Sequence, residues 1–288
     1  MAVAGGCFFR IRECYASLSP KEQQIADFLL ENPREAADMS LGQLAAASGS
    51  SVSSVMRLCK TLKLSGYKEL CKSLCSELPM LEESHEFEDI HPGDSNSAVI
   101  NHLFSSDVNA LRTTVEMNDE AEIERAVELL CAAQRVDFYG VGSSGLVAQD
   151  ASNKFGRIGK TAFASTDPHS QYIMALSLRK GDVAVIVSYS GETTDTVNLA
   201  REIHAAGVKI ISLTKFGPSA IADLADIRLY TGSTETFMRS GAMSSRLCQM
   251  FMIDILYTCV CSRTYSEVKP HLEKTRRSAL HMHTKNQS

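Results

Sequence analysis

The chain has 288 residues, 44% hydrophobic and 22% charged, a composition typical of folded globular domains and not of disordered segments. Its formal net charge of −5 argues against a protein that coats nucleic acid. The longest apolar stretch, "LCQMFMIDILYTCV", includes Asp254 and is too short to span a bilayer, and the first residues lack a signal-peptide pattern, so we expect a cytoplasmic protein without a membrane partner.

The first 77 residues have the pattern of a helical domain. Ser19 before Pro20 is a helix N-cap followed by proline at the first helical position, and "ENP" at 31–33 ends that helix. Further along, Ser40 is expected to cap a short helix that runs through Ala47.

A second helix follows closely. Gly49 supplies a turn with positive φ, and Ser51 or Ser53 caps the next helix, whose apolar face carries Val55 and Leu58. A short helix, a glycine-containing turn and a second helix together form a helix-turn-helix. We therefore predict an all-α helix-turn-helix domain over residues 1–77.

The segment 50–76 is locally basic on an acidic chain. It holds five basic residues and one acidic residue, a local charge of +4. Near its start the second helix is expected to expose side chains that reach base edges and phosphates in a major groove. The predicted DNA-binding residues are Ser51, Ser53, Ser54, Arg57, Lys60 and Lys63. An ordinary helical hairpin with a solvated basic face is the alternative.

Residues 78–97 have the composition of a linker. They are acidic and contain Pro79, Pro92 and Gly93. Helical periodicity then resumes, and two helices precede the first strand, the second of them capped by Asn118 or Asp119. We predict a linker at 78–97, a second domain at 98–262 and a C-terminal tail at 263–288.

The second domain alternates apolar runs with helical segments. Such alternation predicts an α/β doubly wound domain with a parallel sheet. We expect five strands in the order 2-1-3-4-5, which reverses between the first and third strands and places a ligand crevice there. The five apolar runs are "VDFYGVG", "TAFAST", "DVAVIVSYSG", "KIISLT" and "IRLYTGS".

Two loops follow the first and third of these strands, "GVGSSG" at 140–145 and "SYSGETTDT" at 188–196. Both should border the same crevice, each at the start of a helix whose N-terminus favours an anion. Hydroxyl groups suit a phosphate or a polyol, and glycines let the backbone approach it. The predicted binding residues are Gly142, Ser143, Ser144, Ser188, Ser190, Gly191 and Thr193.

The first loop also fits a dinucleotide-binding turn. Gly140, Gly142 and Gly145 have the G-x-G-x-x-G spacing, and Asp167 lies where an acid would hold a ribose. However, the hydroxyl-rich loop after the third strand is not part of that fingerprint, whereas a sugar phosphate accounts for both loops. We favour the sugar phosphate and expect no cofactor.

The cysteines and histidines give no indication of a metal site. The closest cysteine pairs are Cys71 with Cys75 and Cys259 with Cys261, and neither has C-x-x-C spacing. The eight histidines show no H-E-x-x-H spacing. We expect buried cysteines that pack as small hydrophobic side chains.

At these motifs the sequence resembles known families. "GVGSSG" and "VSYSGETTDT" resemble the two phosphosugar-binding loops of the SIS (sugar isomerase) domain, and the helix-turn-helix with "LSPKEQQIADFLLENP" is similar to the RpiR family of bacterial transcription regulators. "DPHSQY" and "ETFMRSGAMSSRLCQMFMIDILY" also match. The resemblance implies a sugar-phosphate effector, operator DNA as a partner, and a homodimer or homotetramer.

Three further residues are candidates for the effector site. Glu235, after the fifth strand, is placed to contact sugar hydroxyls, and Arg239 to pair with an acidic group of the ligand, with a surface ion pair as the alternative. His169, after the second strand, is the third, with a structural histidine as the alternative.

SIS domains also occur in enzymes, so a phosphosugar isomerase remains an alternative. Such an enzyme needs a general base, for which Glu235 and His169 are the candidates. A basic recognition helix has no use in an isomerase, and we therefore expect a transcriptional regulator of sugar metabolism without enzymatic activity. A third possibility is an adaptor that binds a sugar phosphate but not DNA.

Overall fold

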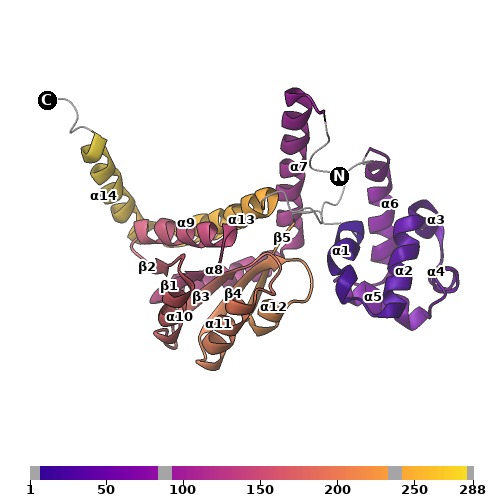
Figure 1. Cartoon of the computed structure of the whole chain (residues 1–288), viewed down its shortest axis with the longest axis horizontal. Helices are drawn as coiled ribbons and strands as arrows, with labels where there is room; N and C mark the ends of the chain where they lie inside the picture. The colour runs from indigo at the N-terminus through magenta and orange to yellow at the C-terminus, as the bar shows by residue number, and fades with distance from the viewer. Residues whose placement is uncertain (1–6, 84–92, 233–241, 284–288) are drawn as a thin grey trace. The chain divides into compact units, whose positions relative to one another are not determined.

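A computed structural model describes residues 7–83, 93–232 and 242–283 (Figure 1). The chain divides into two compact units. The first contains residues 1–117 with two short later segments, 215–218 and 232–244, and the second contains the sheet and the remaining helices. None of the helices in the described ranges is long and apolar enough to cross a membrane.

The first unit is helical, as predicted. Its helices are α1 (Cys7–Cys14), η1 (Tyr15–Ser17), α2 (Pro20–Glu31), α3 (Pro33–Asp38), α4 (Leu41–Ala47), α5 (Val52–Thr61), α6 (Tyr67–Glu83) and α7 (Asn96–Met117). Apolar side chains on the inward faces of α2, α4, α5 and α6 are fully buried, among them Ile25, Leu29, Leu44, Leu58, Leu70 and Leu74.

The predicted start signals of these helices are confirmed. Ser19 is the N-cap of α2, with Pro20 as its first residue, and the carboxylate of Glu22 accepts a hydrogen bond from the Ser19 backbone N–H at 3.0 Å. Ser40 and Gln43 form a reciprocal capping box at the start of α4. These side chains satisfy backbone N–H groups that the first turn of a helix leaves unpaired.

Two boundaries differ from the sequence prediction. Helix α6 continues to Glu83, inside the segment expected to be a linker, although that stretch contains Pro79. Helix α14 (Tyr265–His283) occupies the segment expected to be a tail. Its first turns are anchored by Val268, which is buried in the core, and by Leu272, which packs against it.

The second unit contains the predicted doubly wound sheet. The strands are β1 (Arg135–Tyr139), β2 (Thr161–Ala164), β3 (Val183–Val187), β4 (Lys209–Lys215) and β5 (Ile227–Thr231). Their order is β2-β1-β3-β4-β5, and β1 pairs in parallel with both β2 and β3. The strand order is confirmed, and it changes direction at β1 and β3, where the ligand crevice stays a prediction.

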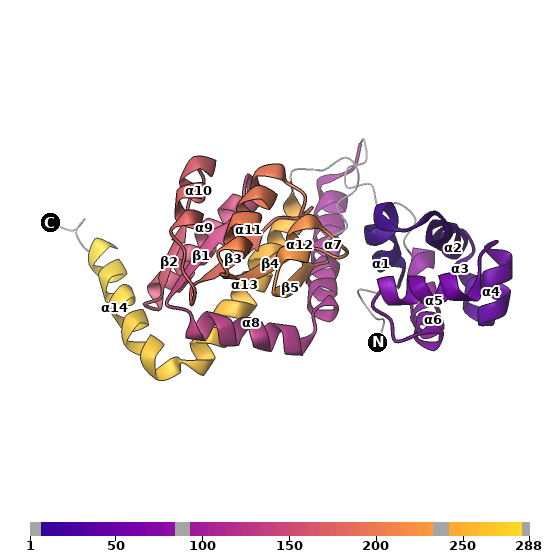
Figure 2. The same ribbon diagram turned by 90° about the horizontal axis from the view of Figure 1, so that it is seen from below.

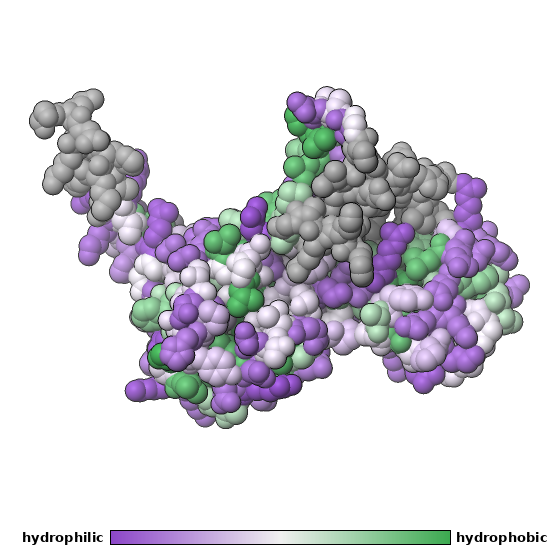
Figure 3. Space-filling model, viewed as in Figure 1, coloured by the Kyte–Doolittle hydropathy of each residue, from purple (hydrophilic) through white to green (hydrophobic). Residues whose placement is uncertain are grey.

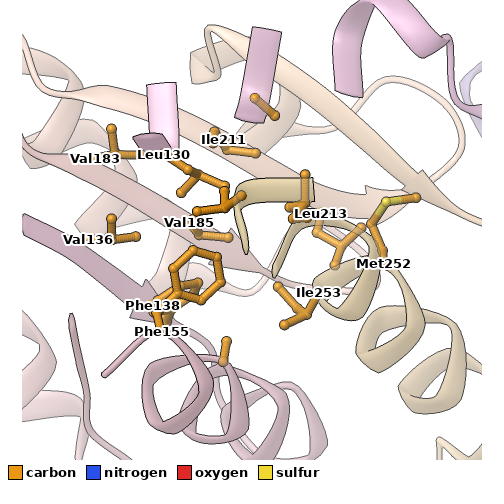
Figure 4. Close-up of a cluster of buried hydrophobic side chains, with 14 of the residues drawn as sticks. Leu130, Val136, Phe138, Phe155, Val183, Val185, Ile211, Leu213, Met252 and Ile253 are labelled. Atoms are coloured by element: carbon orange, nitrogen blue, oxygen red, sulfur yellow. The ribbon is translucent and has the colours of Figure 1, made fainter. Parts of the chain in front are cut away.

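Helices cover both faces of this sheet (Figures 1 and 2). The helices are α8 (Glu120–Ala132), α9 (Ser143–Arg157), α10 (Pro168–Leu176), α11 (Thr194–Ala205), α12 (Ala220–Leu224) and α13 (Met243–Arg263). One core lies between the sheet and α8, α9 and α13, and includes Phe138, Phe155 and Met252 (Figure 4). A second core joins the opposite face to α10, α11 and α12. Since β3 is covered on both sides, all five of its residues are buried.

Helix α7 carries exposed apolar side chains in its first half, green in Figure 3. The relative exposures reach 65% for Ile100 and 69% for Phe104. Val99 and Leu103 are exposed on the same stretch. Isolated exposed apolar residues need no explanation, but a group on one helix is typical of a surface that another molecule covers.

Candidate functional site

The helix-turn-helix consists of α4, a turn and α5. Gly49 in the turn has a φ of 60°, the left-handed conformation that glycine adopts without steric cost. Ser51 caps α5, since its hydroxyl accepts a hydrogen bond from the Ser54 backbone N–H at 3.2 Å. The predicted helix, turn and cap are thereby confirmed.

The exposed face of α5 carries most of the predicted DNA-binding residues. Ser51, Ser53, Arg57 and Lys60 are exposed. The expectation that Ser54 is exposed is wrong, because Ser54 is only 3% exposed and its hydroxyl accepts a hydrogen bond from Arg57 Nη2 at 3.2 Å. Ser54 thus orients the guanidinium group of Arg57 and does not itself face outward.

Lys63 lies beyond the end of this helix. Leu62 is the C-cap of α5, and Lys63 follows it with a φ of 54°. Its side chain is exposed, but it is not carried on the helical face that holds Arg57 and Lys60. It remains a candidate phosphate contact at the edge of that surface.

The loop after β1 leads directly into α9. Gly142 is the N-cap with a φ of 57°, and Ser143 and Ser144 form the first turn of the helix. Gly140 has no room for a side chain, because a Cβ there would lie 2.6 Å from the Ser144 carbonyl oxygen and 3.0 Å from that of Val187. The loop therefore packs tightly against the end of β3, its neighbour in the sheet.

A buried side chain that the sequence analysis did not identify fixes this loop from behind. Gln171 of α10 is 2% exposed, and its Nε2 donates hydrogen bonds to the carbonyl oxygens of Gly140 and Ser165, both at 2.8 Å. It therefore joins the loop after β1 to the loop after β2.

The loop after β3 is folded by its own hydrogen bonds. Ser188 is buried at the end of the strand, and its hydroxyl accepts from the Gly191 backbone N–H at 3.3 Å. Gly191 has a φ of 67°, and a Cβ there would lie 2.2 Å from Ser219 Oγ. The Ser190 hydroxyl accepts from the Glu192 N–H at 3.2 Å, and Thr193 is the N-cap of α11.

The two loops meet as predicted, because β1 and β3 are adjacent and parallel. Each is followed by a helix, so the N-termini of α9 and α11 both begin at the same edge of the sheet. Backbone N–H groups and the helix dipole make such an arrangement suitable for an anion such as a phosphate.

Two buried polar atoms close to these loops have no hydrogen-bond partner among the described residues. They are Gln249 Nε2 and Thr196 Oγ1. Thr196 lies in the first turn of α11, and Gln249 of α13 contacts the first loop, where Ser144 Oγ donates to its Oε1 at 3.3 Å. The sequence signal for Gln249 is a polar residue on a mainly apolar helical face, which also holds Ser245.

The structure leaves the roles predicted for the remaining residues as predictions. His169 is exposed at the start of α10. Asp167, considered as a ribose contact, is instead the N-cap of α10 and accepts from the Ser170 N–H at 2.7 Å, a bond that lowers the pKa of its carboxyl group. Glu235 and Arg239 lie outside the described residues.

A buried ion pair lies on β1. The Asp137 carboxylate is fully buried and accepts from Arg135 Nε at 2.8 Å, from Arg135 Nη2 at 2.7 Å and from the Tyr139 hydroxyl at 3.0 Å. Burial raises the pKa of Asp137 above its usual range in spite of these bonds. All three groups are paired with one another, so they stabilise the sheet and offer no free group to a ligand.

Within the described residues no cluster of three or more histidine, cysteine, aspartate or glutamate side chains could hold a metal ion. Cys14 and Cys59 are buried, and burial raises the pKa of each thiol to about 11. Such thiols are protonated at neutral pH and unreactive.

Comparison with known proteins identifies both parts of the chain. The model of the helix-turn-helix domain of the rpiR family matches residues 6–79, and that of the SIS domain matches residues 128–259, which include both loops. An uncharacterised HTH-type transcriptional regulator of Caldanaerobacter subterraneus is 39% identical over 269 residues, covering 92% of this chain and 94% of its own.

Two further proteins share this organisation. The HTH-type transcriptional regulator HexR of Pseudomonas aeruginosa is 32% identical over 270 residues, which are 91% of this chain and 92% of HexR. The NanR protein of Vibrio vulnificus, solved as a complex with ManNAc-6P, shares the fold with a TM-score of 0.62, 24% identity and coverage of 96% of this chain and 98% of NanR. The chain belongs to the RpiR family of helix-turn-helix transcriptional regulators and carries a SIS domain.

Proposed function

We propose that this regulator binds a sugar phosphate between the loops after β1 and β3, and that the sugar phosphate changes its affinity for operator DNA. The observation that carries the proposal is the meeting of two glycine- and serine-containing loops and two helix N-termini at one edge of the sheet. The complex of NanR with ManNAc-6P supports a phosphorylated sugar as the class of ligand.

The phosphate is proposed to bind to hydroxyl groups and backbone N–H groups of the loops. Ser143, Ser144, Ser190 and Thr193 are all partly accessible at the starts of α9 and α11. Ser188 is buried and holds the turn at Gly191, so its proposed role is to shape the second loop. We propose that the sugar part of the ligand is contacted by Glu235, Arg239 and His169.

On the DNA side, the proposed contacts come from the exposed face of α5. Arg57 and Lys60 are proposed to bind phosphates or base edges, with Ser51 and Ser53 at the start of the helix and Lys63 at its edge. The capped, buried inner face of α5 supports this role, since it holds the outer face rigid.

A homodimer would present two such helices to half-sites about one helical turn apart. The exposed apolar side chains of α7 support the association of two copies. A sugar phosphate that binds one arrangement of the dimer more tightly would shift the population toward it, typically with a coupling of roughly 1–3 kcal/mol.

We propose a sensor and not an isomerase, because two relatives that match more than 90% of the chain are named as transcriptional regulators. Turnover of hexose or pentose phosphates by the purified protein, followed by NMR, would contradict this part of the proposal. Binding without turnover is the expected result.

The DNA arm of the proposal is tested with fragments that the purified protein selects from genomic DNA. The double variant Arg57→Ala with Lys60→Ala should bind them about 10- to 100-fold more weakly, and the slope of log K against log salt should flatten by about two units, one for each lost phosphate contact. Lys180→Ala, which removes an exposed lysine outside this domain, is the matched control and should bind as the wild type.

The effector arm uses the same fragments with added sugar phosphates. An active sugar phosphate should change the affinity for DNA roughly 5- to 150-fold. Ser144→Ala with Ser190→Ala should abolish that response and leave basal DNA binding intact. A response that survives in this variant would place the effector elsewhere.

A further inference from the structure

Gln249 is a polar residue on a helical face that is otherwise built for the core. Residues of α13 at helical spacing are buried along this face, and the glutamine is 1% exposed among them. Its neighbours toward the C-terminus belong to the main apolar core of the sheet. The buried members of the face are Ser245, Cys248, Gln249, Met252, Ile253, Leu256 and Val260.

Only one of the two polar groups of the Gln249 side chain has a hydrogen-bond partner among the described residues. Its Oε1 accepts a hydrogen bond from Ser144 Oγ at 3.3 Å, while its Nε2 has no partner among the described residues. Buried N–H groups without a partner are rare in folded proteins, because each loses its hydrogen bonds to water without replacement. A methionine of similar volume would fill the same space, so stability alone does not account for a glutamine here.

A second buried glutamine, Gln171, contacts the same loop and has a structural role. Gln171 donates from Nε2 to two backbone carbonyl oxygens, those of Gly140 and Ser165. Its donors are fully used by the backbone. Gln249 differs because its one side-chain hydrogen bond among the described residues joins it to the side chain of Ser144, in the first turn of α9 and in the proposed phosphate site.

The direction of the hydrogen bond between Ser144 and Gln249 decides whether Ser144 can donate a hydrogen bond to a ligand. A serine hydroxyl has one proton, and a phosphate oxygen only accepts. While Ser144 donates to Gln249 Oε1, it has no proton left for a phosphate. If the amide of Gln249 turns so that Nε2 donates to Ser144 Oγ, the serine proton is free for the ligand. The turn breaks no other hydrogen bond of Nε2 within the described part of the chain, where that atom has none.

We propose that Gln249 is a positioning residue that turns Ser144 into a hydrogen-bond donor to the phosphate group of the effector. This inference rests on the proposed function, since it requires the loop after β1 to bind the phosphate. In the bound state the hydrogen bonds run in one direction, from Nε2 to Ser144 and from Ser144 to the phosphate, and bonds in such a chain strengthen one another.

Isothermal titration calorimetry of the full-length protein tests the proposal. The probes are inorganic phosphate, glucose 6-phosphate, fructose 6-phosphate and N-acetylmannosamine 6-phosphate. Gln249→Met should weaken the tightest of them about fivefold, the effect of one hydrogen bond, without lowering the melting temperature. Gln249→Glu should weaken it more than about 30-fold, because its carboxylate only accepts from Ser144 and repels the phosphate.

A double-mutant cycle separates positioning from a general structural role. In the Ser144→Ala background, Gln249→Met should cause no further loss of affinity, because Gln249 acts through Ser144. Gln171→Met is the matched control and should lower the melting temperature, since it removes the donor to the buried carbonyl group of Gly140 and to the partly buried one of Ser165. As the pH is lowered, the affinity of Gln249→Glu relative to the wild type should recover, because a protonated carboxyl group can donate to Ser144.

The possible failures are distinguishable. If the wild type binds a probe and the losses from Ser144→Ala and Gln249→Met simply add, the positioning role is overturned while the proposed function stands. If the wild type binds none of the four probes, both the sugar-phosphate function and the inference built on it are overturned.

Discussion

The two candidate functional surfaces of this protein differ in how far apart in the sequence their residues lie. The DNA-facing surface of α5 consists of side chains from one continuous stretch, and its helix is held by a local cap at Ser51. The candidate effector site joins loops that are some 45 residues apart in sequence, and its shape depends on backbone atoms of neighbouring strands. Local sequence signals are therefore enough to predict the first surface, whereas the second surface forms only when the whole sheet has folded.

This difference predicts unequal sensitivity to substitution. Changes that disturb buried polar or tightly packed groups of the sheet unit should cost several kcal/mol, whereas the loss of one cap in the helical unit should cost about 1 kcal/mol. Three substitutions test this comparison, and they are given in order of decreasing expected cost.

Arg135→Met should have the largest effect. It leaves the buried carboxylate of Asp137 with only the Tyr139 hydroxyl, and removing one partner of a buried ion pair typically costs about 3–5 kcal/mol in the free energy of unfolding. Urea unfolding at pH 7 measures it. The double variant Arg135→Met with Asp137→Asn is the control and should recover part of the loss, because no charge is left buried.

The pH dependence of this variant follows from the raised pKa of Asp137. The folded protein binds the proton more tightly than the unfolded chain, so the contribution to stability is fully present below the unfolded pKa, about 3.9, and is lost as the pH rises through the folded pKa. Loss of Arg135 raises the folded pKa further. The loss in the free energy of unfolding caused by Arg135→Met should therefore shrink as the pH falls toward 4. A loss that does not depend on pH would show that the charge of Asp137 is not its cause.

Gly140→Ala should have the next largest effect. The added Cβ would lie 2.6 Å from the Ser144 carbonyl oxygen, and the overlap with backbone should cost about 2–3 kcal/mol. Gly207→Ala is the matched control in the same unit. Gly207 has a φ of 71° and open space around it, so only backbone strain of about 1 kcal/mol is expected. Equal melting temperatures for the two variants would show that Gly140 is not tightly enclosed.

Ser51→Ala should have the smallest effect, about 1 kcal/mol, because it removes one N-cap from the helical unit. Ser53→Ala, its exposed neighbour, should change the free energy of unfolding by less than about 0.5 kcal/mol. Chemical denaturation followed by circular dichroism compares them. If Ser51→Ala lowered the free energy of unfolding as much as Arg135→Met does, the expected difference in sensitivity between the two units would be contradicted.

Several site residues could be predicted because their signals are local. Gly49, Ser40 and Ser51 have the residue types and spacing that turns and caps require. The burial of Ser54 was not predicted, because a serine in the first turn of a helix fits either the inner or the outer face. Which face it takes depends on how α5 rotates when Val55 and Leu58 pack inward.

The glutamines beside the first loop could not be predicted from local signals. Gln171 comes from α10 and Gln249 from α13, and the latter is 105 residues from its partner Ser144. Both helices carry other polar residues as well, and no sequence period tells which backbone atom or side chain each glutamine meets. The length of α14 was missed for a related reason, since the helix is anchored by its contacts with the core at Val268.

Short-range signals in the sequence predict the alternation of strands and helices in the second domain, the two glycine- and serine-containing loops, and the helix-turn-helix. These follow from the apolar period, from caps and from the backbone freedom of glycine, which act over a few residues. Only the tertiary structure decided which buried side chains support the loops, that Ser54 turns inward, and that Gln249 meets Ser144. Those contacts join distant segments, and their geometry is fixed only when the helices pack on the sheet.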